Sequence, residues 1–198
     1  MTYIANITEG GPDAPLFLTF HGTGGDEAQF HDFARSLRPD ATVISPRGDV
    51  REGAANRYFR RTAEGVYDMA DLARAVAKLA AFVAAAQAAR SPRETIGLGY
   101  SNGANILAAT AFAHPHLFDR MVLLHPLIPI TPPPQPGLKG KAVLITAGQR
   151  DPICPAALTE RLAEWLTSQG AEVQTFWHPG GHEIARDEQR AIAAFLAA

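Results

Sequence analysis

A serine framed by two glycines is the strongest chemical signal in the sequence. The segment Gly99-Tyr100-Ser101-Asn102-Gly103 follows an apolar stretch and precedes a helical pattern. A sharp turn from strand to helix would strain the Ser101 backbone, and side chains at both glycine positions would collide. The turn would expose the hydroxyl at the positive end of a helix, where developing negative charge is favoured. The motif therefore predicts a serine nucleophile, although an ordinary glycine-rich turn is the plainer alternative.

A serine hydroxyl is a weak nucleophile at neutral pH, so it needs a base that an acid orients. Where this kind of turn carries the nucleophile, the acid follows the serine along the chain and a histidine follows the acid. Asp151 comes shortly after the apolar run that ends at Thr146, and His182 follows Gly180-Gly181 before the last helical pattern. Either residue alone is explained as well by a turn or a surface loop. Their order and positions together predict a catalytic triad of Ser101, Asp151 and His182.

Other histidines and acids compete for the roles of base and acid. His178 is the nearest alternative to His182, but it leads directly into Pro179 and stays close to a predicted strand. The remaining candidates precede the acid, begin a strand or belong to the last helix: His114, His116, His125, Asp119 and Asp187. Asp151 and His182 are therefore preferred.

A second glycine-rich segment, His21-Gly22-Thr23-Gly24-Gly25, follows the first strong apolar run. A tetrahedral intermediate needs two preorganised backbone N–H donors. We expect one from Asn102, which follows the nucleophile, and the other from this loop, with Thr23 as the candidate. A phosphate-binding loop fits less well, because neither a Gly-x-Gly-x-x-Gly spacing nor a Gly-Lys-Ser/Thr ending is present. His21 precedes Ser101, so we expect it to brace the loop.

An alternation of strand and helix patterns positions these segments. Such alternation predicts an α/β fold, with a mostly parallel sheet of about seven strands and helices on both faces. Helical periods cover residues 69–83, a stretch from 102 onward, 155–170 and the region around 192–196. Strands are expected at residues 16–20, 41–45, 95–99, 121–124, 142–146 and 172–177, with residues 3–7 as a weaker candidate for an edge strand.

Two long loops interrupt the alternation, at residues 46–65 and 126–137. Long loops inside compact domains are often functional. Phe59, Leu127 and Ile128 are predicted to line an apolar substrate pocket, and pinning of the loops to the core explains them equally well. Ion pairing or solvation is the expected fate of the arginines in the first loop, with an anionic substrate group as the alternative: Arg57, Arg60 and Arg61.

Composition excludes several classes of protein. The 198 residues are 46% hydrophobic and 19% charged, which predicts one globular domain over residues 1–198. A formal net charge of -2 gives no electrostatic case for a nucleic-acid partner. Cys154 is the single cysteine, which excludes an intramolecular disulfide and a Cys-x-x-Cys zinc site. We expect it to be a buried thiol and not a nucleophile.

No targeting or membrane segment is predicted. Residues 1–6 lack a basic region followed by an apolar run, so no secretory signal is expected. The longest apolar stretch is far shorter than the ~20 residues that a membrane helix needs. The sequence therefore predicts a cytoplasmic protein that does not insert into membranes.

Several of these motifs together carry a family resemblance that spans nearly the whole chain. They lie at residues 21–27, 45–48, 57–61, 63–68, 99–105, 148–152 and 181–182. With them the sequence resembles the compact carboxylesterase/phospholipase branch of the α/β-hydrolase superfamily, which also contains acyl-protein thioesterases. Within that branch it is most similar to small bacterial hydrolases associated with hydroquinone resistance.

The resemblance implies an α/β-hydrolase fold without a cap domain, without a cofactor and without a metal. It implies Ser101 as nucleophile, Asp151 as orienting acid and His182 as base, with Thr23 and Asn102 as oxyanion donors. A homodimer is left open. The expected activity is hydrolysis of carboxylic esters of small or medium acyl chains, with a small-molecule ester as the binding partner. The alternatives are an acyl thioesterase or lysophospholipase that uses the same triad and, in another class, a non-catalytic binding protein on a hydrolase scaffold.

Overall fold

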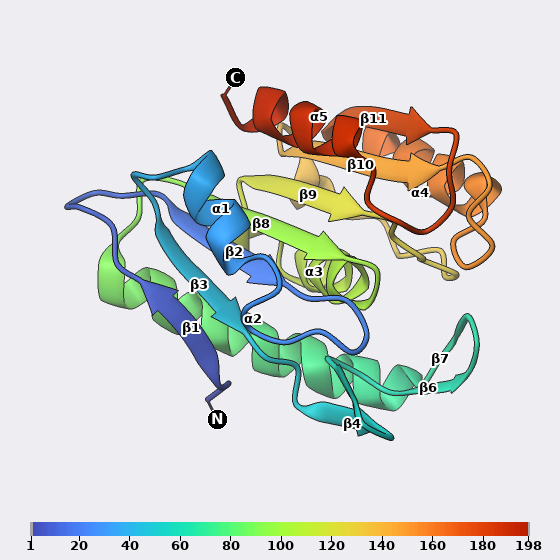
Figure 1. Ribbon diagram of the computed structural model, residues 1–198, viewed down its shortest axis with the longest axis horizontal. Helices are drawn as coiled ribbons and strands as arrows, with labels where there is room; N and C mark the ends of the chain where they lie inside the picture. The colour runs from blue at the N-terminus through green and yellow to red at the C-terminus, as the bar shows by residue number, and fades with distance from the viewer. Residues whose placement is uncertain (1, 198) are drawn as a thin grey trace.

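The apolar runs of the sequence pair into one central sheet in the computed structural model, which describes residues 2–197 (Figure 1). The sheet has seven strands in the order β1-β3-β2-β8-β9-β10-β11. All neighbours are parallel except β1, which runs antiparallel to β3 at the edge. The strands are β1 (Ala5–Thr8), β2 (Leu16–Phe20), β3 (Thr42–Pro46), β8 (Thr95–Tyr100), β9 (Arg120–Leu124), β10 (Ala142–Gly148) and β11 (Glu172–His178). The predicted fold class is confirmed, and so is the edge strand near the N-terminus.

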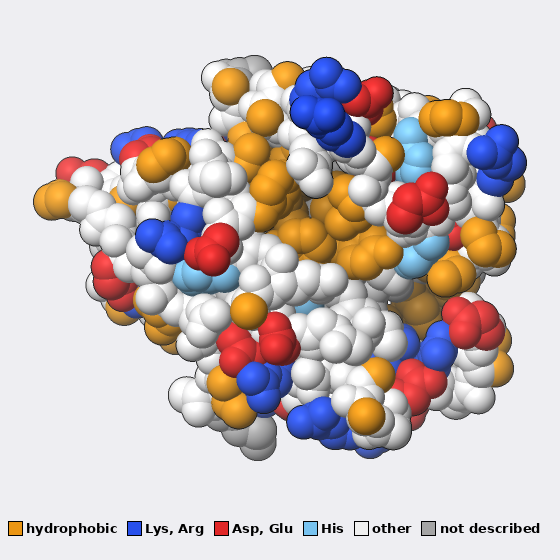
Figure 2. Space-filling model, viewed as in Figure 1, with side chains coloured by type: hydrophobic (Ala, Val, Ile, Leu, Met, Phe, Trp, Pro, Cys, Tyr) orange, Lys and Arg blue, Asp and Glu red, His pale blue; other side chains and the backbone are white. Residues whose placement is uncertain are grey.

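Helices cover both faces of the sheet because its strands are apolar on both sides. Side chains alternate along each strand, so Leu16 and Leu18 join one core and Phe17 joins the other. The first core also contains side chains of three helices: α2 (Met69–Arg90), α3 (Asn102–Ala113) and α4 (Ala156–Ser168). The second contains side chains of α1 (His31–Leu37) and α5 (Arg186–Ala197). Figure 2 shows hydrophobic side chains gathered on this face of the molecule, between α1 and α5.

Two parts of the fold differ from the sequence-based expectation. Helix α1 was not predicted, because its seven residues are too few to display an apolar stripe. The first long loop, expected to be irregular, folds into two small hairpins with positive φ at Gly53 and Gly65. Their strands are too short to show alternation in sequence: β4 (Val50–Glu52), β5 (Ala55–Arg57), β6 (Arg61–Ala63) and β7 (Val66–Tyr67). Two short 3-10 helices complete the fold, η1 (Pro115–Leu117) and η2 (Pro136–Leu138).

The parallel strands end at one edge of the sheet, and the segments predicted to do chemistry follow these ends. Ser101 follows β8, Thr23 follows β2, Asp151 follows β10 and His182 follows β11. Within residues 2–197 no inserted domain covers this edge (Figure 1). None of the helices in that range combines the length and the apolar character that crossing a membrane requires.

Candidate active site

Ser101 occupies a strained turn between β8 and α3. Its φ of 51° and ψ of -114° are rare for a residue with a side chain. A Cβ atom at Gly99 would lie 2.4 Å from the carbonyl oxygen of Gly103, and one at Gly103 would lie 2.1 Å from that of Phe20. Glycine is therefore required on both sides of the serine for this turn to form. The turn places the Ser101 hydroxyl at the N-terminus of α3.

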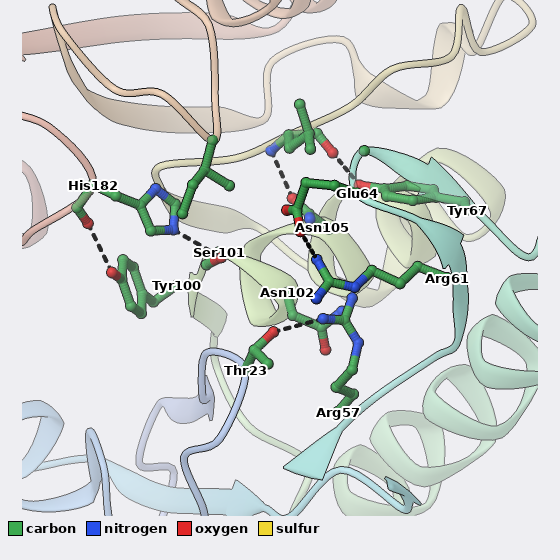
Figure 3. A pocket seen from close by; sticks show the side chains of 13 residues that line it. Thr23, Arg57, Arg61, Glu64, Tyr67, Tyr100, Ser101, Asn102, Asn105 and His182 are labelled. Atoms are coloured by element: carbon green, nitrogen blue, oxygen red, sulfur yellow. Dashed lines mark hydrogen bonds and ion pairs between the residues drawn. The ribbon is translucent and has the colours of Figure 1, made fainter. Parts of the chain in front are cut away.

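Ser101, His182 and Asp151 lie in one hydrogen-bonded line. The Ser101 Oγ atom is 3.0 Å from Nε2 of His182, and Nδ1 of His182 is 2.7 Å from Oδ2 of Asp151. Because the carboxylate can only accept, Nδ1 of His182 carries the proton and Nε2 can accept the serine proton. The Tyr100 hydroxyl donates to the backbone carbonyl of His182 at 2.7 Å and holds this loop in place (Figure 3). This arrangement can activate a hydroxyl as a nucleophile.

The loop after β10 holds the Asp151 carboxylate ionised. The side chain is buried, which raises its pKa, but the backbone N–H of Cys154, then His182, His125 and the N–H of Ile153 lower it. The net pKa lies below the usual value. Oδ1 accepts from Ile153 at 2.8 Å and from Cys154 at 2.9 Å. The Cys154 thiol is itself buried, as expected, and burial raises its pKa, so it is not an activated nucleophile.

Thr23 and Asn102 line the cleft beside Ser101 (Figure 3). Among residues 2–197 neither backbone amide donates a hydrogen bond to a protein acceptor, so both are free for an oxyanion. Their side chains are fixed from the first hairpin: Arg57 Nη1 donates to the Thr23 hydroxyl, and the Tyr58 amide donates to Oδ1 of Asn102, each at 2.8 Å. The hairpin thus positions both predicted oxyanion donors.

His21 braces the glycine-rich loop, as expected. Its Nδ1 lies 2.7 Å from the Gly22 carbonyl, and its Nε2 accepts from the Gly48 amide at 2.9 Å. One ring nitrogen therefore donates and the other accepts, which is the pattern of a neutral ring. Burial lowers the pKa of His21, in agreement with that state.

The cleft above Ser101 has a volume of about 290 Å³ and a mixed polar and apolar lining. Of the three residues predicted to line a pocket, Leu127 does so, whereas Phe59 and Ile128 lie elsewhere. Phe59 is buried beneath the cleft and packs edge-to-face on Tyr67, which does line it. Ile128 lines a separate apolar hollow beside α4, because neighbouring side chains of an extended segment point to opposite sides.

Three arginines of the first long loop, Arg57, Arg60 and Arg61, are ion-paired, as expected. Arg61 pairs with Glu52 and Glu64 beside the cleft, and Arg60 pairs with Asp68 and Asp71. Arg57 is 5% exposed, and one of its nitrogens lies 3.3 Å from a Glu52 oxygen. Arg57 and Arg61, for which contact with an anionic substrate group was the alternative, still reach the cleft, and so does Glu64, to which sequence reasoning assigned no site role (Figure 3).

One further residue that sequence reasoning set aside also meets the acid, and it connects the acid to Glu188. His125 Nδ1 lies 3.1 Å from Oδ2 of Asp151, and its Nε2 lies 3.2 Å from Oε2 of Glu188 in α5. Chain order excluded His125 as the base, but it directly follows β9, the strand beside the one that leads to Asp151. That adjacency was the signal that could have found it.

Two groups of three side chains near Asp151 have the atom types that bind metals. In one group the 2.7 Å separation between His182 and Asp151 fits a direct hydrogen bond. In the other, the Gly180 amide donates to Nδ1 of His178 at 3.0 Å, so this ring carries its proton on Nε2, the nitrogen that a metal would need. Neither group therefore offers three ligand atoms that are free for a metal. The first group is His125, Asp151 and His182, and the second is His125, His178 and Glu188.

Comparison with known proteins agrees with this fold. Residues 47–197 match the family model of the dienelactone hydrolase family. The hydrolase MhqD of Bacillus subtilis is 36% identical over 185 residues, which cover 92% of each chain. Among solved structures, protein Atu2452 of Agrobacterium tumefaciens is 54% identical with a TM-score of 0.95, covering 98% of this chain and 96% of that one. A carboxylesterase of Bacillus cereus is 33% identical with a TM-score of 0.91, covering 98% and 93%.

The extent of these matches is sufficient to assign the family. The family model covers most of the chain, including the turn at Ser101, and lactones are cyclic esters. The chain therefore belongs to the dienelactone hydrolase family, and it is an ester-hydrolysing enzyme with the α/β-hydrolase fold.

Proposed function

We propose that this chain is a serine esterase that cleaves carboxylic esters of small or medium acyl chains through an acyl-enzyme. One observation carries the proposal: the unbroken line of hydrogen bonds from the Ser101 hydroxyl through His182 to Asp151, at a strained turn that faces a cleft. A hydroxyl, a base and an acid in this geometry are the parts that acyl transfer needs.

The proposed reaction runs in two halves. His182 Nε2 takes the proton of Ser101 as Oγ forms a bond to the ester carbonyl carbon. The amides of Thr23 and Asn102 stabilise the resulting oxyanion. The tetrahedral intermediate then collapses, the bond to the alcohol oxygen breaks, and His182 gives its proton to the leaving alcohol. Water, deprotonated by His182, attacks the acyl-enzyme in the same way and releases the carboxylic acid and free Ser101.

The size of the cleft supports a small or medium acyl group. Its volume of about 290 Å³ is near the lower end of the ~300–1,000 Å³ typical of small-molecule sites. No inserted domain within residues 2–197 extends it into a long channel. The carboxylesterase relative from Bacillus cereus also supports an oxygen ester as substrate.

Covalent labelling tests the proposed nucleophile. A fluorophosphonate probe should modify Ser101 in the wild-type protein, as located by peptide mass spectrometry, and should leave the Ser101→Ala variant unmodified. Hydrolysis of 4-nitrophenyl esters should fall about a million-fold in kcat in that variant, as in other triads that lose the serine. Ser168→Ala, which removes an exposed hydroxyl at the end of α4, is the matched control and should keep wild-type activity.

Two results would contradict the proposal. Esterase activity that persists in purified Ser101→Ala would exclude Ser101 as the nucleophile. Absence of labelling in a folded wild-type sample would instead favour a binding protein on a hydrolase scaffold. Competition between matched oxygen esters and thioesters, scored by kcat/KM, decides between an esterase and a thioesterase that would use the same three residues.

A further inference from the structure

A buried chain of hydrogen bonds continues beyond Asp151 to the far side of the carboxylate. His125, Asp151 and Glu188 each have side chains that are 0% exposed. His125 lies between the two carboxylates, 3.1 Å from Oδ2 of Asp151 and 3.2–3.3 Å from both oxygens of Glu188. The Asp151 oxygen that meets His125 is the same one that meets His182. One carboxylate oxygen therefore serves two histidines.

The partners of His125 define its charge. Both ring nitrogens face ionised carboxylates, which can only accept, so both must carry a proton for both hydrogen bonds to form. Burial lowers the pKa of His125, but the hydrogen bond and charge of Glu188, followed by those of Asp151, raise it, and the net pKa lies above the usual value. Burial likewise raises the pKa of Glu188, but its contact with His125 lowers it overall. His125 is thus a buried imidazolium between two carboxylates.

The backbone of His125 is held in an unusual conformation. Its φ of 49° is left-handed, a conformation that a residue with a side chain adopts rarely and only where the surrounding structure imposes it. The surroundings do so on both sides: the His125 amide donates to the Thr146 carbonyl at 2.9 Å, and the Cys154 thiol donates to the His125 carbonyl at 3.2 Å. The end of β9 is therefore bound directly to the loop that carries Asp151.

Other titratable groups around His125 complete its electrostatic surroundings. Glu188 is also approached by His178, whose Nε2 lies 3.1 Å from Oε1 in an orientation that does not give a hydrogen bond. The groups come from every neighbouring element: Tyr100 from β8, Asp151 and Cys154 from the loop after β10, His178 from β11, His182 and Glu183 from the next loop, and Glu188 from α5.

We propose that His125 and Glu188 are positioning residues of the catalytic base. Glu188 holds the buried His125 imidazolium in place, and this imidazolium fixes the Asp151 oxygen that orients His182. The inference rests on the proposed function, because it assigns His182 as the base. A cation that shares this oxygen places a positive charge beside His182, whose ring centroid is 5.3 Å from that of His125. The clamp therefore couples the charge of His125 to the hydrogen bond that orients His182.

The Glu188→Gln variant tests the clamp with little change of shape. A glutamine amide can donate to Nε2 of His125, so the ring can stay in place as a neutral donor to Asp151 while its positive charge is lost. We expect the low-pH limb of the kcat/KM profile to move up by roughly 0.5–1 pH unit. Glu94→Gln is the matched control, because Glu94 pairs with Arg38 and Arg120 before β8 begins, at the opposite end of the sheet. Its profile should equal that of the wild type.

A readout without turnover separates this inference from the proposed function. Nitrogen NMR of histidine-labelled protein at pH 7 should show His125 doubly protonated in the wild type and singly protonated in Glu188→Gln. A singly protonated wild-type His125 overturns the proposal, as does a low-pH limb that does not move in folded Glu188→Gln. If the wild-type protein shows a doubly protonated His125 yet hydrolyses no ester and resists the fluorophosphonate, the proposed function fails and the charge assignment stands. The wild-type spectrum is decisive even if the variant does not fold.

Discussion

At the scale of single residues, the site depends on glycines as much as on the residues with reactive groups. Ser101 can take its strained conformation only because nothing larger than hydrogen stands at Gly99 and Gly103. The side chains of Thr23 and Asn102, whose amides are the proposed oxyanion donors, are held by the Arg57 side chain and by the backbone amide of Tyr58. The reactive geometry is therefore a property of close backbone packing around one hydroxyl.

Gly99→Ala should disturb the site from a position that bears no reactive group. The new Cβ would lie 2.4 Å from the Gly103 carbonyl oxygen, so the turn must open and move Ser101. We expect a loss of roughly 1–3 kcal/mol in the free energy of unfolding and at least a tenfold lower kcat. Urea unfolding and ester hydrolysis measure the two effects. Gly11→Ala is the control, because a Cβ there meets nothing within 4 Å, and it should leave both values unchanged.

The contact among Ser101, Asp151 and His182 could be predicted because each residue follows a strand of one parallel sheet, and parallel strands end at one edge. The same reasoning missed His125. Chain order was used to choose the base, and this criterion excluded His125, although His125 contacts the acid Asp151. Only the strand order, which places β9 beside β10, reveals that contact.

At the scale of elements, the loop after β9 divides its side chains between two cavities. Leu127 lines the cleft, and its carbonyl accepts a hydrogen bond from the Tyr67 hydroxyl of β7, whereas Ile128 faces the hollow beside α4. Asn105 in α3 also fixes this loop, since its Oδ1 accepts from the Leu127 amide at 2.7 Å. The loop is thus a fixed wall of the cleft.

Leu127→Ala should therefore change the preference for acyl chain length. Removing the side chain enlarges the cleft, so we expect kcat/KM for hexanoate relative to acetate esters to rise about five- to tenfold. Ile128→Ala is the matched control: it truncates a side chain of the same loop outside the cleft and should lower stability without changing the ratio. Equal ratios in wild type and Leu127→Ala would exclude Leu127 from the acyl site.

Elements with a long periodic pattern or an apolar run could be predicted, whereas helix α1 and the hairpin strands could not. Helix α2 runs from Met69 to Arg90, which is long enough to display an apolar stripe. Its N-terminus is capped by Asp68, whose side chain accepts a hydrogen bond from the Asp71 amide. Helix α1 and the hairpins β4–β5 and β6–β7 are held by tertiary contacts instead. One such contact is the hydrogen bond from the Asn56 side chain to the Gly25 carbonyl, which no local pattern in the sequence contains.

At the scale of the whole molecule, the chain from Ser101 to Glu188 joins elements that are far apart in sequence. It links the end of β8, the loop after β11, the loop after β10, the end of β9 and the first turn of α5. Helix α5 packs on the opposite face of the sheet from α3, which begins next to Ser101. The hydrogen-bonded chain therefore couples the site to both helical layers, and its charges should influence global stability.

The pH dependence of unfolding should reveal this coupling. The pKa values of Asp151 and Glu188 are lowered in the folded state, so their contribution is present above the unfolded values of 3.8 and 4.5 and is lost as pH falls through the folded ones. The pKa of His125 is raised, so its contribution is complete below 6.5 and is lost as pH rises through the folded value. The network should stabilise the fold most between about pH 4.5 and 6.5.

The double variant His125→Asn/Glu188→Gln removes two of these charges while asparagine tolerates the left-handed backbone. The difference in unfolding free energy between wild type and this variant, measured in urea from pH 4 to 9, should be largest near pH 5–6 and should shrink on both sides. The Glu94→Gln variant should give a difference without that maximum. A difference that stays level from about pH 6.5 to 9 would show that His125 is neutral in the folded protein, because a neutral ring would add no term that is lost as pH rises.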